Sequence, residues 1–259
     1  MTIPNKNSGL QVYLDAMASE GVYPSKRNLH RYLKHLFKTV DFEGARVLDI
    51  GGGNGLFSFY AGSCGAERVT CLEPTGAGSS PHTESTFSRL ATHLGLSTRV
   101  QLCTETIQAF EPGAKTYDVV LMHHSINHID ESACIRLEYD QSARAVYQSM
   151  FRKLFLMCSP SAQLIVCDCS RQNVYAQLGV RNPFLPMIEW GKHQTPWVWI
   201  SILSAVGFER PRVRWQAFNT LGPIGQIFLS NRAVAYFLTS LFTLTMVKSP
   251  IIQPWSVAN

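Results

Sequence analysis

Along the chain, short runs of apolar residues alternate with longer stretches in which apolar residues recur every three or four positions. The short runs predict buried strands, and the longer stretches predict amphipathic helices. The predicted strands are residues 46–50, 68–72, 99–103, 117–122, 163–169, 212–218 and 242–247. The predicted helices between them are residues 56–63, 85–94, 143–157 and 196–205.

This alternation indicates right-handed crossovers between parallel strands. We therefore predict an α/β fold in which a mostly parallel, seven-stranded sheet carries helices on both faces. Residues 1–40 and residues 171–196 do not fit the alternation. We expect an N-terminal helical cap from the first segment and a lid insertion after strand five from the second, because open α/β sheets bind ligands at the carboxyl ends of their strands. The main domain is then residues 41–259.

The composition is that of a globular chain with a large core. Of the 259 residues, 46% are hydrophobic and 16% are charged, and no internal repeat is evident. The formal net charge is +5, which is too small to require a nucleic-acid or anionic-lipid partner. Many of the positive charges fall in one segment, where apolar residues interleave at helical spacing. We interpret that segment as an amphipathic helix with a solvated basic face. Its basic residues are Lys26, Arg27, Arg31, Lys34 and Lys38.

The seven cysteines form no C-x-x-C pair. An odd, unpatterned set of thiols without a secretory leader is typical of a reduced, cytoplasmic protein. The longest apolar run, residues 233–247, is interrupted by Thr and Ser. A helix that spans a membrane needs about 20 apolar residues, so we predict no membrane span.

A glycine-rich segment follows the first predicted strand. Gly51, Gly52, Gly53 and Gly55 fill four of five consecutive positions. Residues without a Cβ let the chain turn sharply into a helix while a ligand lies against bare backbone. Glu73 ends the second predicted strand, where a carboxylate can accept hydrogen bonds from a ribose diol.

The order of residues in this loop distinguishes two kinds of nucleotide cofactor. A dinucleotide fingerprint requires G-x-G-x-x-G, but Leu56 stands where the third glycine would follow Gly51 and Gly53. Asp49, just before the loop, would repel a pyrophosphate. The loop therefore favours a cofactor that carries an ammonium group and no phosphate.

Four segments at the ends of predicted strands stand in a fixed order along roughly residues 40–170. They are Asp49–Gly55, Cys71–Pro74, Tyr117–Met122 and Leu164–Asp168. Together they resemble the motifs of class I S-adenosylmethionine-dependent methyltransferases. Gly207-Phe208, before a final apolar strand, adds to this resemblance.

The resemblance implies a Rossmann-like sheet, S-adenosyl-L-methionine as the cofactor and S-adenosyl-L-homocysteine as its product. By position, it implies that Gly51, Gly53 and Gly55, with Gly52 between them, line the methionine and ribose portion. It also implies that Asp49 faces the methionine end through water or a backbone amide.

The resemblance assigns further contacts to later segments. Glu73 would hold the ribose hydroxyls and Pro74 would border the adenine. The family often has an acidic residue after strand three, and here the matching stretch is Glu105, Thr106 and Ile107. Glu105 is its carboxylate and Thr106 is the better ungapped match, so both remain candidates.

Strand four contributes the last contacts that the resemblance implies. Met122 and His123 would border the sulfonium and the adenine. His128 matches a histidine that is common at this position in the family, where its role is often structural or on the cofactor side.

Methyl transfer to a hydroxyl or a protonated amine benefits from a general base, and histidine suits that task near neutral pH. His123 and His124 are candidate bases, and the alternative is a polar role beside the cofactor. His124 and His128 are four residues apart and would share one face of a helix. We predict no metal, because no Glu stands between these two as in H-E-x-x-H and no third ligand follows.

His193 is the third candidate base. It lies in the expected lid, in an aromatic-rich stretch just before a helix that begins at Pro196. The alternative is a helix-terminal residue with local hydrogen bonds. Asp168, at the end of strand five, is expected to cap the following turn rather than to act in the chemistry.

The function we predict is methyl transfer from S-adenosylmethionine to oxygen or nitrogen of a small-molecule acceptor, natural products included. The basic, aromatic-bearing cap favours an anionic or conjugated acceptor. Alternatives are a non-catalytic S-adenosylmethionine-binding regulatory or partner subunit and a methyltransferase of macromolecules. A nucleic-acid substrate is not expected, because DNA amino-methylating enzymes have an Asn/Asp-Pro-Pro-Tyr/Phe motif where this chain has His123-His124-Ser125-Ile126. The oligomeric state is left open.

Overall fold

The computed structural model describes residues 6–74, 82–113, 116–216 and 230–249. Its centre is a seven-stranded sheet in the order β3-β2-β1-β4-β5-β7-β6. The strands are β1 Arg46–Ile50, β2 Arg68–Leu72, β3 Val100–Cys103, β4 Tyr117–His123, β5 Cys158–Cys169, β6 Phe208–Trp215 and β7 Leu241–Lys248.

The strands from β3 to β5 in this order run parallel, and β7 is antiparallel to both β5 and β6. The predicted mostly parallel, seven-stranded α/β fold is therefore confirmed. Two strand boundaries were wrong. The fifth strand begins at Cys158 rather than at residue 163, and the sixth covers Phe208–Trp215 rather than residues 212–218, of which residues 217 and 218 lie outside the described part. Gly207 has φ +110, so the turn there leads directly into β6.

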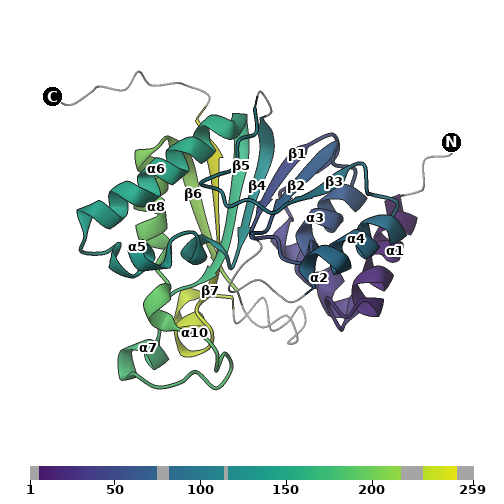
Figure 1. Cartoon of the computed structure of the whole chain (residues 1–259). Helices are drawn as coiled ribbons and strands as arrows, with labels where there is room; N and C mark the ends of the chain where they lie inside the picture. The colour runs from purple at the N-terminus through teal and green to yellow at the C-terminus, as the bar shows by residue number, and fades with distance from the viewer. Residues whose placement is uncertain (1–5, 75–81, 114–115, 217–229, 250–259) are drawn as a thin grey trace.

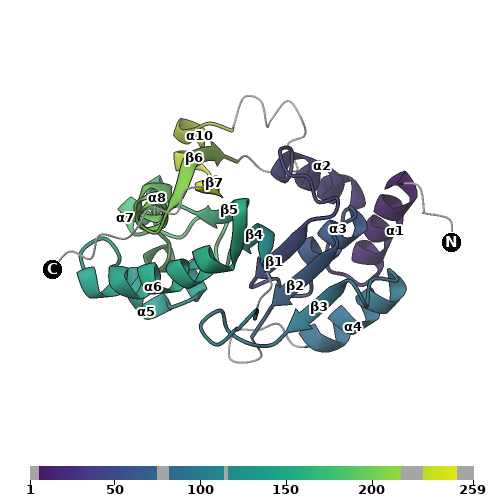
Figure 2. The same cartoon turned by 90° about the horizontal axis from the view of Figure 1, so that it is seen from above.

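Helices cover both faces of the sheet (Figure 1), as predicted. In Figure 2, α1 to α4 lie together on one side and α5, α6 and α8 on the other. The core is accordingly divided into two apolar clusters, one against each face. The α-helices are α1 Lys6–Ser19, α2 Lys26–Leu36, α3 Leu56–Ser63, α4 Thr83–His93, α5 Glu131–Arg136, α6 Gln141–Met157, α7 Val174–Leu178, α8 Pro196–Ala205 and α10 Arg232–Phe237.

The two N-terminal helices pack into the core of the sheet. The basic segment forms α2, whose buried residues are Leu29, Tyr32, Leu33 and Leu36, so its interpretation as an amphipathic helix is confirmed. In α1, the Tyr13 hydroxyl donates to the carbonyl of Leu56, 2.8 Å away. This contact ties the N-terminal segment to the start of α3.

The segment expected to form a lid follows β5 and contains α7 and the short 3₁₀ helix η2, Trp190–Lys192. Figure 1 shows α7 beside α10 at one end of the sheet. Helix α8 begins with Pro196, and the Thr195 side chain accepts from the amide of Val198. Whether the segment closes over a ligand stays a prediction.

Two further predictions concern the thiols and the membrane. All seven cysteines are free. Within the described ranges, no helix combines the length and the apolar character needed to cross a bilayer.

A polar contact joins three strands at the amino end of the sheet. Asp118 on β4 accepts from the backbone amide and the guanidinium of Arg46 on β1, at 2.9–3.0 Å. It also accepts from the Ser159 hydroxyl on β5, at 2.6 Å. Burial alone would raise the pKa of Asp118, but the hydrogen bonds from Arg46 and Ser159 outweigh it and hold that pKa at about 2.

We expect Asp118→Asn to destabilise the protein by about 1 kcal/mol, because the side chain is partly exposed and solvent screens its charge. The folded-state pKa lies below the ordinary value, so this stabilisation is present above about pH 4 and is lost as the pH falls toward 2. Urea unfolding of both proteins at several pH values measures it. Glu111→Gln is the control, since Glu111 pairs with Lys153 while 78% exposed. Equal effects of the two variants would contradict the prediction.

Candidate functional site

A pocket of about 680 Å³ opens at the carboxyl ends of β1, β2 and β4. This volume suits a nucleoside-sized ligand. Ten of the residues that line it lie in or beside predicted site segments. They are Ile50, Gly51, Leu72, Glu73, Pro74, Glu105, Thr106, Ile107, His124 and His128. The other four, Gln108, Ser125, Ile129 and Glu131, are not among the predicted site residues.

Gly51 of the glycine loop lines this pocket, whereas Gly52, Gly53 and Gly55 are not among its lining residues. Gly51 has φ +70, and a Cβ there would lie 2.4 Å from the Cβ of Ser125. Its amide donates to the carbonyl of Leu72, 2.7 Å away. A Cβ on Gly52 would lie 2.5 Å from the Cys71 Sγ. The loop therefore needs glycine at both positions in order to sit between β2 and the segment after β4.

Gly53 and Gly55 have positive φ angles of +53 and +82. Around Gly53 an added Cβ would meet no atom within 4 Å, so its backbone faces open space. The amide of Gly53 donates to the Glu73 carboxylate, 2.8 Å away. This bond connects the predicted ribose-binding carboxylate to the loop, and Glu73 also lines the pocket beside Pro74.

Asp49 lies beneath the loop and is completely buried. One carboxylate oxygen accepts from the Ser58 hydroxyl at 2.7 Å, and the other has no hydrogen-bond partner. Burial raises the pKa of Asp49, the hydrogen bond from Ser58 opposes this, and the charge of Glu73 adds to the rise, so the pKa is about 6. A cation in the pocket would stabilise the ionised form of this carboxyl group.

The segment after β3 reaches the same pocket. Glu105, Thr106 and Ile107 all line it, and Ile107 is buried whereas the other two are exposed. Both candidates for the adenine contact are thus brought to the pocket, and the choice between them stays open.

The charge of the lining is negative. Among the described residues that line the pocket, Glu73, Glu105 and Glu131 are acidic and none is Lys or Arg. Glu131 is paired with Lys192 at 3.0 Å. Such a lining fits a cofactor with a sulfonium and an ammonium group, and it does not fit a pyrophosphate. The open space at Gly53 and the unpartnered oxygen of Asp49 fit the same cofactor.

The structure separates the three candidate bases. His123 lies on the opposite side of β4 from the pocket and hydrogen-bonds the Tyr32 hydroxyl of α2. Burial and the neighbouring His124 lower the pKa of His123 well below its ordinary value. The Met122 side chain is fully buried in the core. Neither side chain lines the pocket, because β4 directs Met122 into the core and His123 toward α2.

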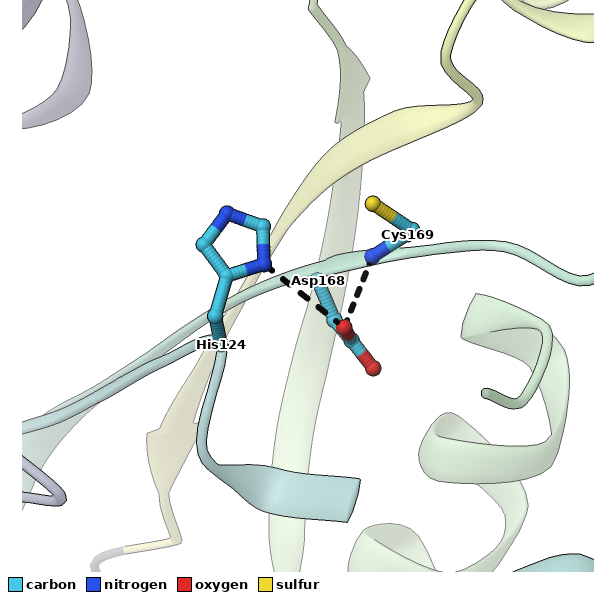
Figure 3. A group of neighbouring side chains, drawn as sticks. All are labelled: His124, Asp168 and Cys169. Atoms are coloured by element: carbon cyan, nitrogen blue, oxygen red, sulfur yellow. Dashed lines mark hydrogen bonds and ion pairs between the residues drawn. The ribbon is translucent and has the colours of Figure 1, made fainter. Parts of the chain in front are cut away.

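His124 does line the pocket and has φ +53, a conformation that is strained for a residue with a Cβ. Its amide donates to the carbonyl of Cys167 at 2.8 Å, which fixes the backbone at this point. Its Nδ1 lies 3.8 Å from the Asp168 carboxylate. Figure 3 shows His124 and Asp168 facing one another across the ends of β4 and β5.

Asp168 is completely buried and connects the pocket to the expected lid. Its Oδ1 atom accepts from the Cys169 amide at 2.8 Å and lies 2.9 Å from Nδ1 of His193. Burial alone would raise the pKa of Asp168, but the neighbouring imidazoles of His124 and His193 outweigh it and lower that pKa. The expectation that Asp168 caps the next turn was wrong, because Ser170 accepts from the Gln172 amide there.

His193 and His128 have different surroundings. His193 is 7% exposed, holds Asp168 and does not line the pocket. His128 belongs to the 3₁₀ helix η1, Ile126–His128, and its Nδ1 contacts Glu131 at 2.6 Å. Since His124 precedes η1, the shared helical face considered for His124 and His128 does not form.

His124, Asp168 and Cys169 each bring one potential metal-ligand atom within 4.8 Å of the others (Figure 3). Burial, followed by the charge of Asp168, raises the pKa of the Cys169 thiol well above its ordinary value. A thiol that stays protonated is a poor ligand, and Asp168 Oδ1 already accepts the bonds described above. We therefore interpret the group as a hydrogen-bonded cluster, and the absence of a metal stays a prediction.

Comparison with known proteins identifies the family. A family model described as a methyltransferase domain matches residues 23–210, which is well over half of the chain, and the protein belongs to this family. The cofactor is accordingly S-adenosyl-L-methionine. No curated protein sequence matches the chain.

Solved structures share the fold at low sequence identity. A Listeria monocytogenes protein assigned as an S-adenosylmethionine-dependent methyltransferase has a TM-score of 0.58 at 16% identity, with 87% of this chain and 100% of that one covered. An S-adenosylmethionine-dependent methyltransferase of Mesorhizobium loti has a TM-score of 0.56 at 14% identity, with 84% and 98% covered. The [4+2]-cyclase SpnF has a TM-score of 0.55 at 15% identity, with 85% and 80% covered. At these identities the likeness shows the fold alone.

The raised pKa of Asp49 predicts the pH dependence of stability. Because the folded-state pKa of about 6 exceeds the ordinary 3.8, the unfolded chain loses this proton first as the pH rises. The contribution of Asp49 therefore becomes less favourable between about pH 4 and pH 6, by up to about 3 kcal/mol.

We expect Asp49→Asn to abolish this loss, so that at pH 7 the variant is at least as stable as the wild type. Thermal melting between pH 4 and pH 7 measures the difference, and Asp41→Asn at an exposed position is the control. The same slope against pH in the wild type and in Asp49→Asn would show that the carboxyl group is not buried as described.

Proposed function

We propose that the protein transfers the methyl group of S-adenosylmethionine to oxygen or nitrogen of a small-molecule acceptor, with His124 as the general base. The observation that carries this proposal is the position of His124. It is the only candidate base whose side chain, in the part of the chain that the structure describes, both lines the cofactor pocket and faces a buried carboxylate.

The cofactor supplies a methyl carbon bonded to a positively charged sulfur. A lone pair of the acceptor oxygen or nitrogen forms the new bond to that carbon, while the carbon–sulfur bond breaks and its electron pair stays on the sulfur of S-adenosylhomocysteine. The acceptor's proton passes to His124. Since the leaving group is a neutral thioether, the protein mainly positions the reactants and removes this proton.

Asp168 supports His124 electrostatically in this proposal. A buried, ionised carboxylate 3.8 Å from Nδ1 stabilises the imidazolium that forms when His124 takes the proton. His193 donates to the same carboxylate and so fixes its orientation. We assign His124 as the catalytic residue and Asp168 and His193 as positioning residues.

For the cofactor we propose the contacts that the family resemblance implies. Glu73 accepts from the ribose hydroxyls, Pro74 borders the adenine, and Glu105 or Thr106 contacts the adenine amino group. The shared pocket lining supports this arrangement. We also propose a cytoplasmic location, which is supported by the seven free thiols.

A second candidate function is binding without methyl transfer. The likeness to SpnF supports this second candidate function, because SpnF has this fold and its name describes it as a [4+2]-cyclase and not as a methyltransferase. Turnover of methyl-labelled S-adenosylmethionine across a panel of hydroxyl and amine metabolites distinguishes the two functions. Label transfer to any acceptor supports the enzyme, and tight cofactor binding without label transfer to any member supports the alternative.

We expect Glu73→Ala to weaken S-adenosylhomocysteine binding roughly 10- to 100-fold, as expected for loss of hydrogen bonds to a charged group. Isothermal titration calorimetry measures the affinity. Glu67→Ala is the matched control, because Glu67 is an exposed carboxylate that precedes β2 whereas Glu73 follows the same strand. Unchanged affinity in Glu73→Ala would remove Glu73 from the cofactor site.

We expect His124→Gln to lower kcat roughly 100-fold, the usual contribution of a general base, with S-adenosylhomocysteine affinity unchanged. Asp168→Asn should lower kcat less, because it leaves the base in place. His30→Gln on the exposed face of α2 is the control. Full turnover in His124→Gln would exclude this residue as the base.

A further inference from the structure

A second pocket, of about 290 Å³, lies beside the segment after β5. Its lining residues are Arg171, Ala176, Gln177, Trp190 and Gly191. None of them lines the cofactor pocket. This pocket is therefore separate from the cofactor pocket.

Two buried hydrogen-bond donors in this lining lack partners. The Nη1 atom of Arg171 and the Nε1 atom of Trp190 are buried and make no hydrogen bond. A buried donor without a partner costs about 1–3 kcal/mol. Arg171 forms an ion pair with Glu138, but the carboxylate lies 3.6 Å from Nη1, beyond hydrogen-bond distance, and is 44% exposed.

Gln177 adds a third donor to the lining. Its side-chain oxygen accepts from the Tyr236 hydroxyl of α10. The amide nitrogen of Gln177 can therefore donate to another partner. The guanidinium and the indole N–H are donors only. A ligand that satisfies all three groups must offer several acceptor atoms, and the fixed positive charge of Arg171 selects a negatively charged one.

This pocket adjoins the proposed catalytic centre. Arg171 follows Asp168 by three residues. The Trp190 ring packs edge-on against the His193 ring, with centroids 6.3 Å apart, and His193 bonds Asp168. The Trp190 ring therefore lies between the pocket and the His193–Asp168 pair.

We propose that this second pocket binds an oxyanion group of the methyl acceptor, a carboxylate or a phosphate monoester, through Arg171 and Trp190. The proposal rests on the methyltransferase function above and deepens it, because it defines the acceptor as a small anionic molecule. The oxyanion replaces Glu138 as the partner of Arg171, and its bonds hold the acceptor so that its nucleophilic atom points toward His124.

The test uses the full chain saturated with S-adenosylhomocysteine and three probes: benzoate, phenyl phosphate and benzamide. Ligand-observed nuclear magnetic resonance gives their dissociation constants. Benzamide has nearly the shape of benzoate without its charge, so we expect saturable binding of at least one anion and at least tenfold weaker binding of benzamide. The tighter of the two anions identifies the group as carboxylate or phosphate.

Three variants connect the binding to the pocket. We expect Arg171→Gln to weaken the anion at least tenfold, and Trp190→Phe, which keeps a ring but removes the N–H, to weaken it about threefold to tenfold. Arg181→Gln, at an exposed position of the same segment, should leave the affinity unchanged. Thermal melting of each variant shows that it remains folded.

The outcomes separate this proposal from the proposed function. If no anion binds saturably, or if Arg171→Gln and Arg181→Gln weaken it equally, the oxyanion site is wrong even where calorimetry shows normal S-adenosylhomocysteine binding. If calorimetry of the unsaturated wild type shows no S-adenosylhomocysteine binding, the proposed function fails, whatever the probes do. Selective loss of the anion in Arg171→Gln, with cofactor affinity retained, supports the proposal.

Discussion

The site depends on the register of four adjacent parallel strands. Ile50 of β1 pairs with Leu72 of β2 and with Met122 of β4, and His123 of β4 pairs with Cys167 of β5. Residues that follow these pairs by one or two positions must therefore lie close together at the carboxyl ends of the strands. They include the glycine loop, Glu73, His124 and Asp168. A shift of one residue between two strands would turn these side chains to the opposite face.

Much of this arrangement was predictable from the sequence, because strand exits are marked by strong local signals. Glycines follow Ile50, and a Glu-Pro pair follows Leu72. Few structural contexts other than the end of a strand require these sequences. These sequence signals predict where the backbone of each strand ends. They carry no information about which side of a strand a side chain faces when both faces are buried, since the alternation of apolar and polar residues is then lost. His123 and His124 illustrate the difference: adjacent in sequence, one contacts α2 and the other the pocket.

The contact between Asp168 and His193 was missed for a related reason. A carboxylate after a strand is most often a turn cap, and its sequence neighbours gave no sign of His193, which lies 25 residues further along the chain. Packing of the segment after β5 against α5 brings that histidine back to the sheet. The Cys134 thiol, which donates to the carbonyl of Lys192 at 3.3 Å, and the Gln194 amide, which donates to the carbonyl of Cys134 at 2.6 Å, hold that segment in place. Contacts of this kind form only in the folded chain, and no local sequence pattern predicts them.

The two buried carboxylates of the site show how hydrogen bonding determines the charge of a buried group. Asp49 has the Ser58 hydroxyl and an unpartnered oxygen, and burial prevails, so its pKa rises to about 6. Asp168 is just as buried and its Oδ2 atom also lacks a partner. However, its Oδ1 atom accepts from the Cys169 amide and lies 2.9 Å and 3.8 Å from Nδ1 of His193 and of His124, and its pKa falls. Asp168 is therefore negatively charged near neutral pH, whereas Asp49 becomes half protonated when the pH falls to about 6. In the proposed mechanism, the negative charge of Asp168 stabilises the imidazolium of His124, and a positively charged cofactor near Asp49 would favour the ionised form of that carboxyl group.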